Sequence, residues 1–292
     1  MVDPVISVIV PVWNDHKRIG QCIEALKRQS LHPDLFEIIV VDNGSTDSTV
    51  SVVLSYPGVT LLHEPKPGSY AARNTGLAYA RGEYAAFTDS DCIPQRDWLE
   101  CGLNTVAGRT DIGIVAGRVA FCEPAGTYER ACLNYDRHIS LRQEDYARAG
   151  RAITANWFSR KSILLENGGF DTRTKSGADH ELSRRVSKSG LQTIYLSTAT
   201  VMHPPRTQVA EITERARRLV GGRWSATTGR LRLLRRIKTE TQKLVGRSWI
   251  IARAKNLTFR ERVEVWGLLL HVWAVSLSEL LRLQLGGVPT RS

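Results

Sequence analysis

The sequence feature that most limits the possible folds is a short apolar run that ends in two carboxylates. Residues 84–88, Tyr-Ala-Ala-Phe-Thr, follow a glycine turn and precede Asp89 and Asp91. A run of this length after a glycine predicts a buried strand of a parallel sheet rather than a helix. Ligands of open α/β sheets bind just beyond the carboxyl ends of such strands, where carboxylates and substrate phosphates can hold a hard divalent cation. The two acids therefore predict a metal and phosphate site, although an isolated Asp-Ser-Asp would also suit a helix-capping turn.

Two further apolar runs end in the same kind of polar cluster. Residues 7–12 stop at Trp-Asn-Asp, and residues 37–41 stop at Asp42, which opens a polar stretch. Between the two runs, apolar residues recur at helical spacing, namely Ile19, Cys22, Ile23 and Leu26. The pattern predicts a strand–helix–strand unit whose strand ends share one sheet edge. No Gly-x-Gly-x-x-Gly follows either strand, which argues against a dinucleotide-binding fold.

The second polar cluster holds two carboxylates with different expected roles. Residues 45–47 supply oxygens suited to the start of the next helix, so we interpret Asp47 as a cap rather than a ligand. Asp42 directly follows the strand, where a carboxylate can accept a hydrogen bond from a base imide or a ribose hydroxyl. We therefore expect Asp42 to bind the base or the ribose of a nucleotide.

Four segments of the chain resemble the family 2 glycosyltransferases of the GT-A fold. They read SVIVPVWND, IIVVDNGSTD, KPGSYAARNTGLAYARGEYAAFTDSD and ITANWFSRKSILLENGGFDTRTKSGADHELSRRVSKSG, and they span about residues 5–205. Each segment alone is weakly specific, but four in the family's order make a specific pattern. The resemblance implies an α/β, Rossmann-like GT-A domain with a mostly parallel central sheet. It also implies a divalent metal, Mn²⁺ or Mg²⁺, a nucleotide-sugar donor, and transfer of the sugar with inversion.

A loop and a helix after the second cluster form the expected phosphate-binding side. Residues 65–69 read as a loop, and we expect Ser69 to cap a helix over residues 70–80. Arg73 then lies near the positive end of that helix, where phosphate is favoured. A surface salt bridge would also explain this arginine, whereas the resemblance implies a place near the donor nucleotide. Lys66 is a weaker candidate, because exposed loop lysines are usually only solvated.

The resemblance also implies roles for the residues at the strand ends. Pro11 and Trp13 are expected to form the wall of the nucleotide pocket, with hydrophobic packing as the alternative for Trp13. Asp91 is expected to contact the metal directly, and Asp89 to contact the ribose or a metal-bound water. His203 follows a strand-like run and precedes two prolines. Family members can use a histidine here as a further metal ligand, and a structural role is the alternative.

The acceptor side is expected in the second half of the matching region. The segment Gly-Ala-Asp-His-Glu-Leu at residues 177–182 opens a helix with Asp179 in its first turn. Capping would explain Asp179, but the resemblance makes it the catalytic base, and an attacking alcohol must lose a proton. The family often has glutamate where this chain has Ala178, so the acceptor contacts of that glutamate do not carry over. Asn156 and Trp157 are expected to line the acceptor pocket, with core packing as the alternative for Trp157.

Length and composition bound the remaining organisation. With 292 residues, 42% of them hydrophobic, the chain has room for a sheet domain of about 200 residues and an appendage. The apolar N-terminal run lacks a basic flank and reads as the first strand, so we expect no signal peptide and a cytoplasmic location. Five cysteines without a Cys-x-x-Cys pair predict reduced, mostly buried thiols, and we expect Cys92 to pack rather than react.

The positive charge of the chain is concentrated in one segment. The net charge is +11, and residues 206–262 contain sixteen Lys or Arg and four Glu, so the rest of the chain is nearly neutral. This asymmetry predicts an anionic partner. No recognised nucleic-acid-binding motif accompanies the charge, which disfavours nucleic acid as that partner.

The segment after residue 205 reads as helical. Apolar spacing predicts helices over residues 208–220 and 230–245, and a capping-box signature at Thr258 opens a last helix to about Leu285. The longest stretch of that helix without a charged residue has 14 residues, whereas a spanning helix needs roughly 20. Tryptophans with flanking arginines favour a helix lying in a membrane interface, and packing on the sheet domain or on a partner chain is the alternative. These tryptophans are Trp249, Trp266 and Trp273.

The sequence therefore predicts a GT-A domain over residues 1–205 and a basic, mostly helical extension over residues 206–292. We interpret the chain as a metal-dependent, inverting glycosyltransferase with a nucleotide-sugar donor, UDP-type favoured. The expected acceptor is a hydroxyl of a lipid-linked glycan or polysaccharide at the inner face of the membrane. The alternatives are a polyprenyl-phosphate glycosyltransferase and a non-catalytic nucleotide-sugar- or polyanion-binding protein. A sugar-1-phosphate nucleotidyltransferase is disfavoured, because no glycine-rich loop with Thr-Arg follows the first strand.

Overall fold

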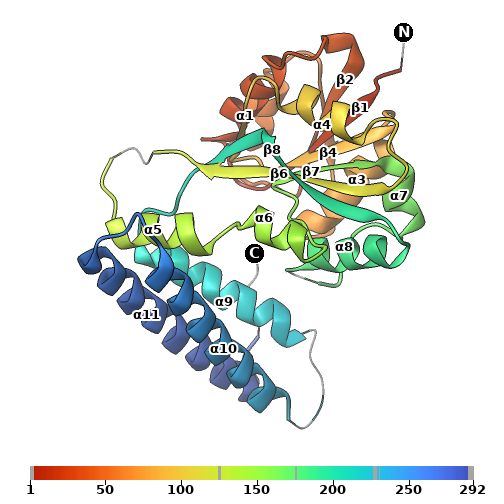
Figure 1. The fold of residues 1–292 in the computed structure, drawn as a ribbon. Helices are drawn as coiled ribbons and strands as arrows, with labels where there is room; N and C mark the ends of the chain where they lie inside the picture. The colour runs from red at the N-terminus through yellow and green to blue at the C-terminus, as the bar shows by residue number, and fades with distance from the viewer. Residues whose placement is uncertain (1–2, 124–125, 175, 226–228, 230, 289–292) are drawn as a thin grey trace. The chain divides into compact units, whose positions relative to one another are not determined.

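The computed structural model describes residues 3–123, 126–174, 176–225, 229 and 231–288. The chain divides into two compact units (Figure 1). Residues 1–120, 143–172 and 177–203 form the first, which we call the sheet unit. Residues 121–142, 173–176 and 204–292 form the second, which we call the helical unit. The predicted functional division at residue 205 stays a prediction.

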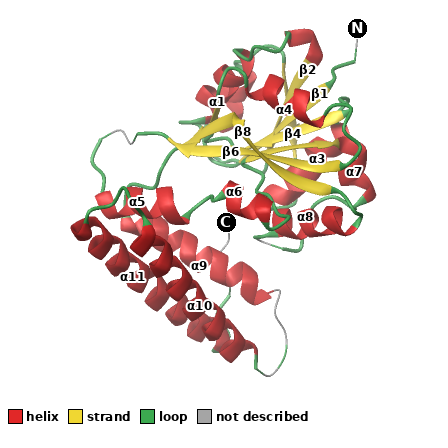
Figure 2. Ribbon diagram, viewed as in Figure 1, coloured by secondary structure: helices red, strands yellow, loops and turns green. Residues whose placement is uncertain are grey.

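The sheet unit is built on one mixed sheet, with the strand order β3-β2-β1-β4-β7-β6-β8-β5 (Figure 2). The first four strands in this order run parallel, whereas β7 pairs antiparallel with both β4 and β6, and β5 pairs antiparallel with β8. The strands are β1 (Ile6–Val12), β2 (Phe36–Asp42), β3 (Val59–His63), β4 (Tyr84–Thr88), β5 (Ile93–Pro94), β6 (Ile112–Phe121), β7 (Asn156–Arg160) and β8 (Gln192–His203). The α/β class with C-terminal helices is confirmed.

Helices between the strands bury their apolar residues against this sheet. In the register of the sheet, Ile9 of β1 pairs with Ile39 of β2 and with Phe87 of β4, and all three are buried. The helices are α1 (Ile19–Lys27), α2 (Thr49–Leu54), α3 (Ser69–Tyr79), α4 (Trp98–Val106), α6 (Gln143–Arg148), α7 (Lys161–Glu166) and α8 (Ala178–Lys188). The four apolar positions predicted to form one face of α1 are all buried.

Helix α3 packs unusually close to the strands, because a glycine lies at the contact. A Cβ atom on Gly76 would lie 2.5 Å from the Ile9 side chain, so a larger residue would push the helix away. Gly68 occupies the N-cap position with φ 127°, so the helix begins at Ser69 rather than being capped by that residue. This close packing fixes the first turns of α3 relative to β1 and β2.

The helical unit contains α5 (Arg130–Ile139), α9 (Val209–Ser225), α10 (Arg232–Arg253) and α11 (Phe259–Gln284). Its core consists of apolar side chains from these helices, including Cys132, Ile212, Ile251, Val265 and Leu269. The predicted capping box is present: the Thr258 hydroxyl accepts from the Glu261 N–H, and the Glu261 carboxylate accepts from the Thr258 N–H. The second predicted helix extends further than expected, to Arg253.

Two of the three tryptophans expected at a membrane interface form hydrogen bonds from α11 to α10. The Trp266 indole N–H donates to the Ser248 carbonyl at 3.3 Å, and the Trp273 indole N–H donates to the Thr241 hydroxyl at 3.2 Å. Trp249 differs, since it is 59% exposed. The indole rings of Trp266 and Trp273 are partly buried, and each N–H finds an acceptor on α10.

Candidate active site

The strand order places a switch point at the carboxyl ends of β1 and β4. The chain runs outward from β1 to β2 and β3 and then crosses back, so that β4 lies on the other side of β1. In open α/β sheets such a switch point is where ligands bind. The segments that follow the two strands meet here, because the Ser90 hydroxyl donates to the Asp15 carboxylate at 2.7 Å. The polar cluster that follows β1 and the polar cluster that follows β4 therefore lie at the same edge of the sheet.

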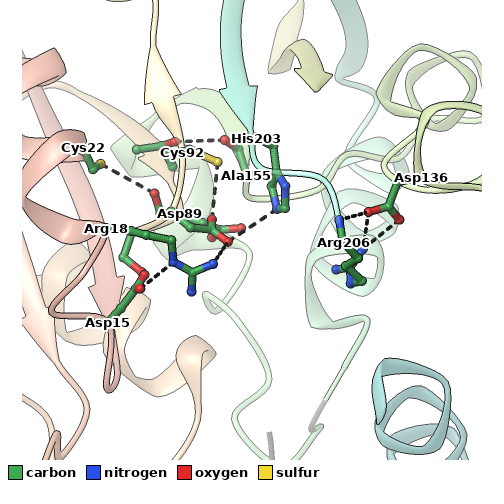
Figure 3. A network of polar contacts seen from close by, with 12 residues as sticks. Asp15, Arg18, Cys22, Asp89, Cys92, Asp136, Ala155, His203 and Arg206 are labelled. Carbon is green, nitrogen blue, oxygen red and sulfur yellow. Dashed lines mark hydrogen bonds and ion pairs between the residues drawn. The ribbon is translucent and has the colours of Figure 1, made fainter. Parts of the chain in front are cut away.

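Asp15 and Arg18 form an ion pair at this edge (Figure 3). Asp15 is buried, its backbone N–H donates to the Thr49 hydroxyl at 2.8 Å, and its carboxylate accepts from Arg18 Nε at 2.6 Å. The guanidinium Nη1 lies 3.5 Å from the Asp91 carboxylate, and the arginine side chain is about half exposed. A buried carboxylate thus holds a guanidinium against the residues that follow β4.

Asp91, Cys92 and His203 form a group that could hold a metal ion. Their ligand atoms all lie within 4.8 Å of one another, and His203 Nε2 is 3.7 Å from the Asp91 carboxylate. Burial and the carboxylates of Asp91 and Asp89 raise the pKa of the Cys92 thiol well above its ordinary value, so the thiol stays protonated. Carboxylate oxygen suits Mn²⁺ and Mg²⁺, and imidazole suits Mn²⁺, whereas a protonated thiol is a poor ligand for either ion. The donor set Asp91 and His203 therefore fits the divalent metal that the sequence predicts.

Arg73 connects the first turn of α3 to the residues after β4. Its side chain is buried, it pairs with the Asp89 carboxylate, and its guanidinium lies 5.6 Å from the centre of the Tyr70 ring. A planar guanidinium fixed by a carboxylate on one side and an aromatic ring on the other has little freedom to move. Arg73 is thus a positioned cation rather than a solvated surface arginine.

Asp179 lies at the start of α8 and is bound to the same helix α3. Its carboxylate accepts from the Tyr70 hydroxyl at 3.2 Å and from the His180 N–H at 2.9 Å. Burial, reinforced by the negative charge of Asp179, raises the pKa of the Tyr70 hydroxyl, which therefore remains a hydrogen-bond donor. The chain of contacts Asp89, Arg73, Tyr70 and Asp179 links the strand-end carboxylates to the predicted base.

The carboxylates that follow β2 mainly organise their own loop. Asp42 is buried and accepts from the N–H groups of Gly44 and Ser45 at 3.1 and 3.2 Å, while His63 Nδ1 lies 3.2 Å away. Asp47 accepts from the Thr49 N–H at 2.9 Å at the start of α2, which agrees with its expected role at a helix start. The donor contact predicted for Asp42 stays a prediction.

The predicted pocket walls and acceptor residues differ strongly in exposure. Pro11 is buried within β1, whereas Trp13 just beyond it is 46% exposed. Asn156 is completely buried: its amide donates to the carbonyls of Arg118 and Ala199 and accepts from the Trp98 indole. Trp157 is equally buried in the core of the sheet. The structure thus gives Asn156 and Trp157 structural contacts, and an acceptor contact by either stays a prediction.

Three residues of this edge received no role from the sequence, namely Asp15, Arg18 and Tyr70. A helical spacing could have drawn attention to Tyr70, because Tyr70 and Arg73 are three residues apart within α3 and residues at this spacing face the same side of a helix. Asp15 and Arg18 precede the first residue of α1, Ile19, so no helical spacing links them.

Comparisons of the sequence with known proteins match glycosyltransferases. Residues 7–168 match the model of glycosyl transferase family 2. The chain is 33% identical over 209 residues to glycosyltransferase AglE of Haloferax volcanii. The matched segment covers 70% of this chain and 68% of AglE. It is 30% identical over 216 residues to the pre-mycofactocin glycosyltransferase of Mycobacterium tuberculosis, covering 70% of this chain but only 44% of that protein.

Solved structures show the same fold. The mannosyltransferase PcManGT of Pyrobaculum calidifontis, in complex with GDP-Man and Mn²⁺, matches with a TM-score of 0.64 at 21% identity, covering 97% of this chain and 87% of that one. TarS of S. aureus (residues 1–349) in complex with UDP matches with a TM-score of 0.55 at 17% identity, covering 96% and 91%. These matches confirm the GT-A architecture.

Proposed function

The chain belongs to glycosyl transferase family 2 and is a glycosyltransferase, and on this premise we propose that it transfers a sugar, with inversion, from a nucleotide-sugar to a hydroxyl acceptor with the help of a divalent metal. The observation that carries the proposal is the arrangement at the switch point: a carboxylate–imidazole pair lies beside two positioned arginines. We propose a UDP-type donor, as the sequence predicts. The binding test described below also includes GDP, because a structural neighbour is a complex with GDP-Man.

The pairing of charges at this edge supports a metal–diphosphate ligand. Asp15 is paired with Arg18 and Asp89 with Arg73, whereas Asp91 lies 3.7 Å from His203 Nε2 as well as 3.5 Å from Arg18 Nη1, so we assign Asp91 and His203 to the metal. The two arginines offer guanidinium groups, which are well suited to phosphate oxygens. Arg18 and Arg73 would bind the diphosphate of the donor, and Asp91 and His203 would hold the metal. A bound divalent cation would supply charge neutralisation for the leaving nucleotide diphosphate.

The transfer step needs one proton acceptor, and we assign that role to Asp179. The acceptor oxygen forms a bond to the anomeric carbon as the bond from that carbon to the nucleotide diphosphate breaks, and the hydroxyl proton passes to the Asp179 carboxylate. The Tyr70 hydroxyl, which donates to that carboxylate, fixes its orientation.

We propose a hydroxyl of a lipid-linked glycan or a polysaccharide as the acceptor. The similarity to AglE and to the pre-mycofactocin enzyme, whose names state glycosyl transfer, supports the general class of reaction. A cytoplasmic location, on the side where nucleotide-sugars are expected, stays a prediction.

Metal-linked donor binding tests the proposal. UDP or GDP should raise the thermal unfolding temperature of the full chain with Mn²⁺ present and much less with EDTA. A ligand at a hundredfold excess over its Kd adds about 2.7 kcal/mol to the free energy of unfolding. Asp91→Ala should abolish the metal-dependent part, whereas Asp34→Ala, which removes an exposed carboxylate far along the chain, should preserve it. A metal-dependent shift that survives in Asp91→Ala would show that another group holds the metal.

A further inference from the structure

The exposed large apolar side chains of this protein are concentrated on two helices. Of the fifteen such side chains among the described residues, ten lie between residues 231 and 288. They are Leu231, Leu234, Val245, Trp249, Phe259, Val263, Leu270, Leu281, Leu285 and Val288. Single exposed apolar residues are normal on a protein surface, but a group of this size marks an interaction site.

These side chains follow the helical period, so they form continuous faces. From the N-cap of α10 onward, positions 231, 234, 238, 242, 245, 249 and 253 are exposed, while Glu240 and Ile251 on the other side are buried. On α11, positions 259, 263, 267, 270, 274, 278 and 281 are exposed, while Val265, Leu269 and Val272 lie in the core. The two helices pack against each other in the helical unit (Figure 1). We call the exposed residues of 231–288 the outer face.

The charges of the outer face are all of one sign. Among the described residues 231–288, six Lys or Arg are exposed, and none of the Asp or Glu falls in the exposed class. The cations are Arg235, Lys238, Arg253, Lys255, Arg260 and Arg282. Cations also accompany the apolar groups directly, since the Arg253 guanidinium lies 4.3 Å from the centre of the exposed Trp249 ring. The surface is therefore both apolar and cationic.

We propose that the outer face docks on the surface of a lipid bilayer that contains anionic lipids. Apolar side chains enter the boundary between headgroups and acyl chains, while Lys and Arg contact anionic headgroups. An exposed tryptophan beside an arginine suits this boundary, where one end of the side chain is apolar and the other is hydrated. This inference goes beyond the proposed transfer reaction and does not depend on the donor site, so its test can fail while that function stands.

Charge and burial favour a lipid surface over the two other occupants. A second copy placed by two-fold symmetry would set the same cationic surface against itself, and none of the Asp or Glu that the structure describes in residues 231–288 falls in the exposed class. Helix α11 is long and apolar enough to cross a membrane by length and composition, but 39% of its most apolar window is buried within the protein. That inner side includes the buried carboxylate of Glu279, which pairs with Arg282. One side of α11 is thus used by the core, and the other is available to lie on a membrane.

Sedimentation of the full chain with vesicles tests the proposal. The protein should bind vesicles of phosphatidylcholine with phosphatidylglycerol at low salt and bind pure phosphatidylcholine much more weakly. Each neutralised cation should weaken binding by about fivefold, so Arg235→Gln/Lys238→Gln/Arg253→Gln should weaken it by about a hundredfold. Trp249→Gln should weaken it by about tenfold, because the lost apolar burial no longer contributes. As the matched control, Leu54→Gln/Leu165→Gln alters exposed apolar residues of the sheet unit and should bind like the unaltered protein.

Three results would overturn the proposal. The first is equal binding to neutral and anionic vesicles, or no binding to either at low salt. The second is a dimer in analytical ultracentrifugation that Trp249→Gln converts to a monomer, which would make the outer face an interface between copies. The third is protein that stays with the vesicles through an alkaline carbonate wash, which would indicate a spanning helix. Quenching of Trp249 by brominated lipid, absent in Trp249→Phe, would support docking even if a multiple variant folded poorly.

Discussion

The two units of this protein both bury members of ion pairs, but the groups around those pairs differ. In the sheet unit, Arg73 is buried against Asp89 and Asp15 against Arg18, and the carboxylate of Asp91 lies near both Arg18 and His203. In the helical unit the carboxylates are the buried members, as in Glu240 with Lys243 and Glu279 with Arg282.

The difference follows from the cost of burying charge. An ion placed in the interior requires a partner, because its lost hydration must be compensated. Desolvation and the nearby Arg223 lower the pKa of Lys243 to about 8 even with Glu240 beside it. The groups beside these pairs carry the chemical information: the carboxylate of Asp91 and the imidazole of His203 could hold a metal, and the exposed Lys and Arg of residues 231–288 suit an anionic partner.

The largest expected effect concerns the proposed chemistry of the sheet unit. Asp179→Asn keeps the oxygen that accepts from Tyr70 and from the His180 N–H, but it cannot take a proton. Transfer to the acceptor should fall by about 10²- to 10⁴-fold, while donor binding measured by calorimetry should be unchanged. Glu181→Gln, two residues along the same helix, is the control and should retain activity. Loss of activity in Glu181→Gln with an active Asp179→Asn would reassign the base.

Two adjacent leucines of α11 test whether the core and the outer face of the helical unit are separate. Leu269 is 2% exposed and belongs to the core, whereas Leu270 is 54% exposed. Leu269→Ala should lower the free energy of unfolding by about 2–5 kcal/mol, and Leu270→Ala should change it by less than about 0.5 kcal/mol. Denaturant unfolding measures both. Equal losses in the two variants would contradict the division of α11 into a core side and an outer side.

A smaller effect is expected from Arg18, which we propose to bind the diphosphate. Hydrogen bonds to charged groups contribute about 1.5–3 kcal/mol, so Arg18→Gln should weaken UDP binding by about tenfold to a hundredfold. Binding of UMP, which lacks the second phosphate, should change little, and calorimetry in the presence of Mn²⁺ measures both ligands. Arg28→Gln, at the opposite end of α1, is the matched control. An equal loss for UMP and UDP would indicate that Arg18 acts on folding of the site rather than on the diphosphate.

The sequence by itself determined the local elements of this protein. Apolar runs located the first strands and their polar ends, helical spacing identified the buried face of α1, and Thr258 with Glu261 located the start of α11. These features depend on contacts between residues a few positions apart, and such contacts leave a period or a cap in the sequence. The concentration of positive charge after residue 205 was also visible without a fold.

Only the tertiary structure decided which of these elements face one another. Arg18 reaches Asp91, and Tyr70 reaches Asp179, because the order of the strands and the close packing of α3 bring distant segments together. The orientation of α11 about its axis places Trp266 against α10 and leaves Leu270 exposed to solvent. Such pairings depend on how whole faces of helices and strands pack over long distances in the sequence. Many side chains determine that packing together, so no local sequence pattern predicts a single pairing.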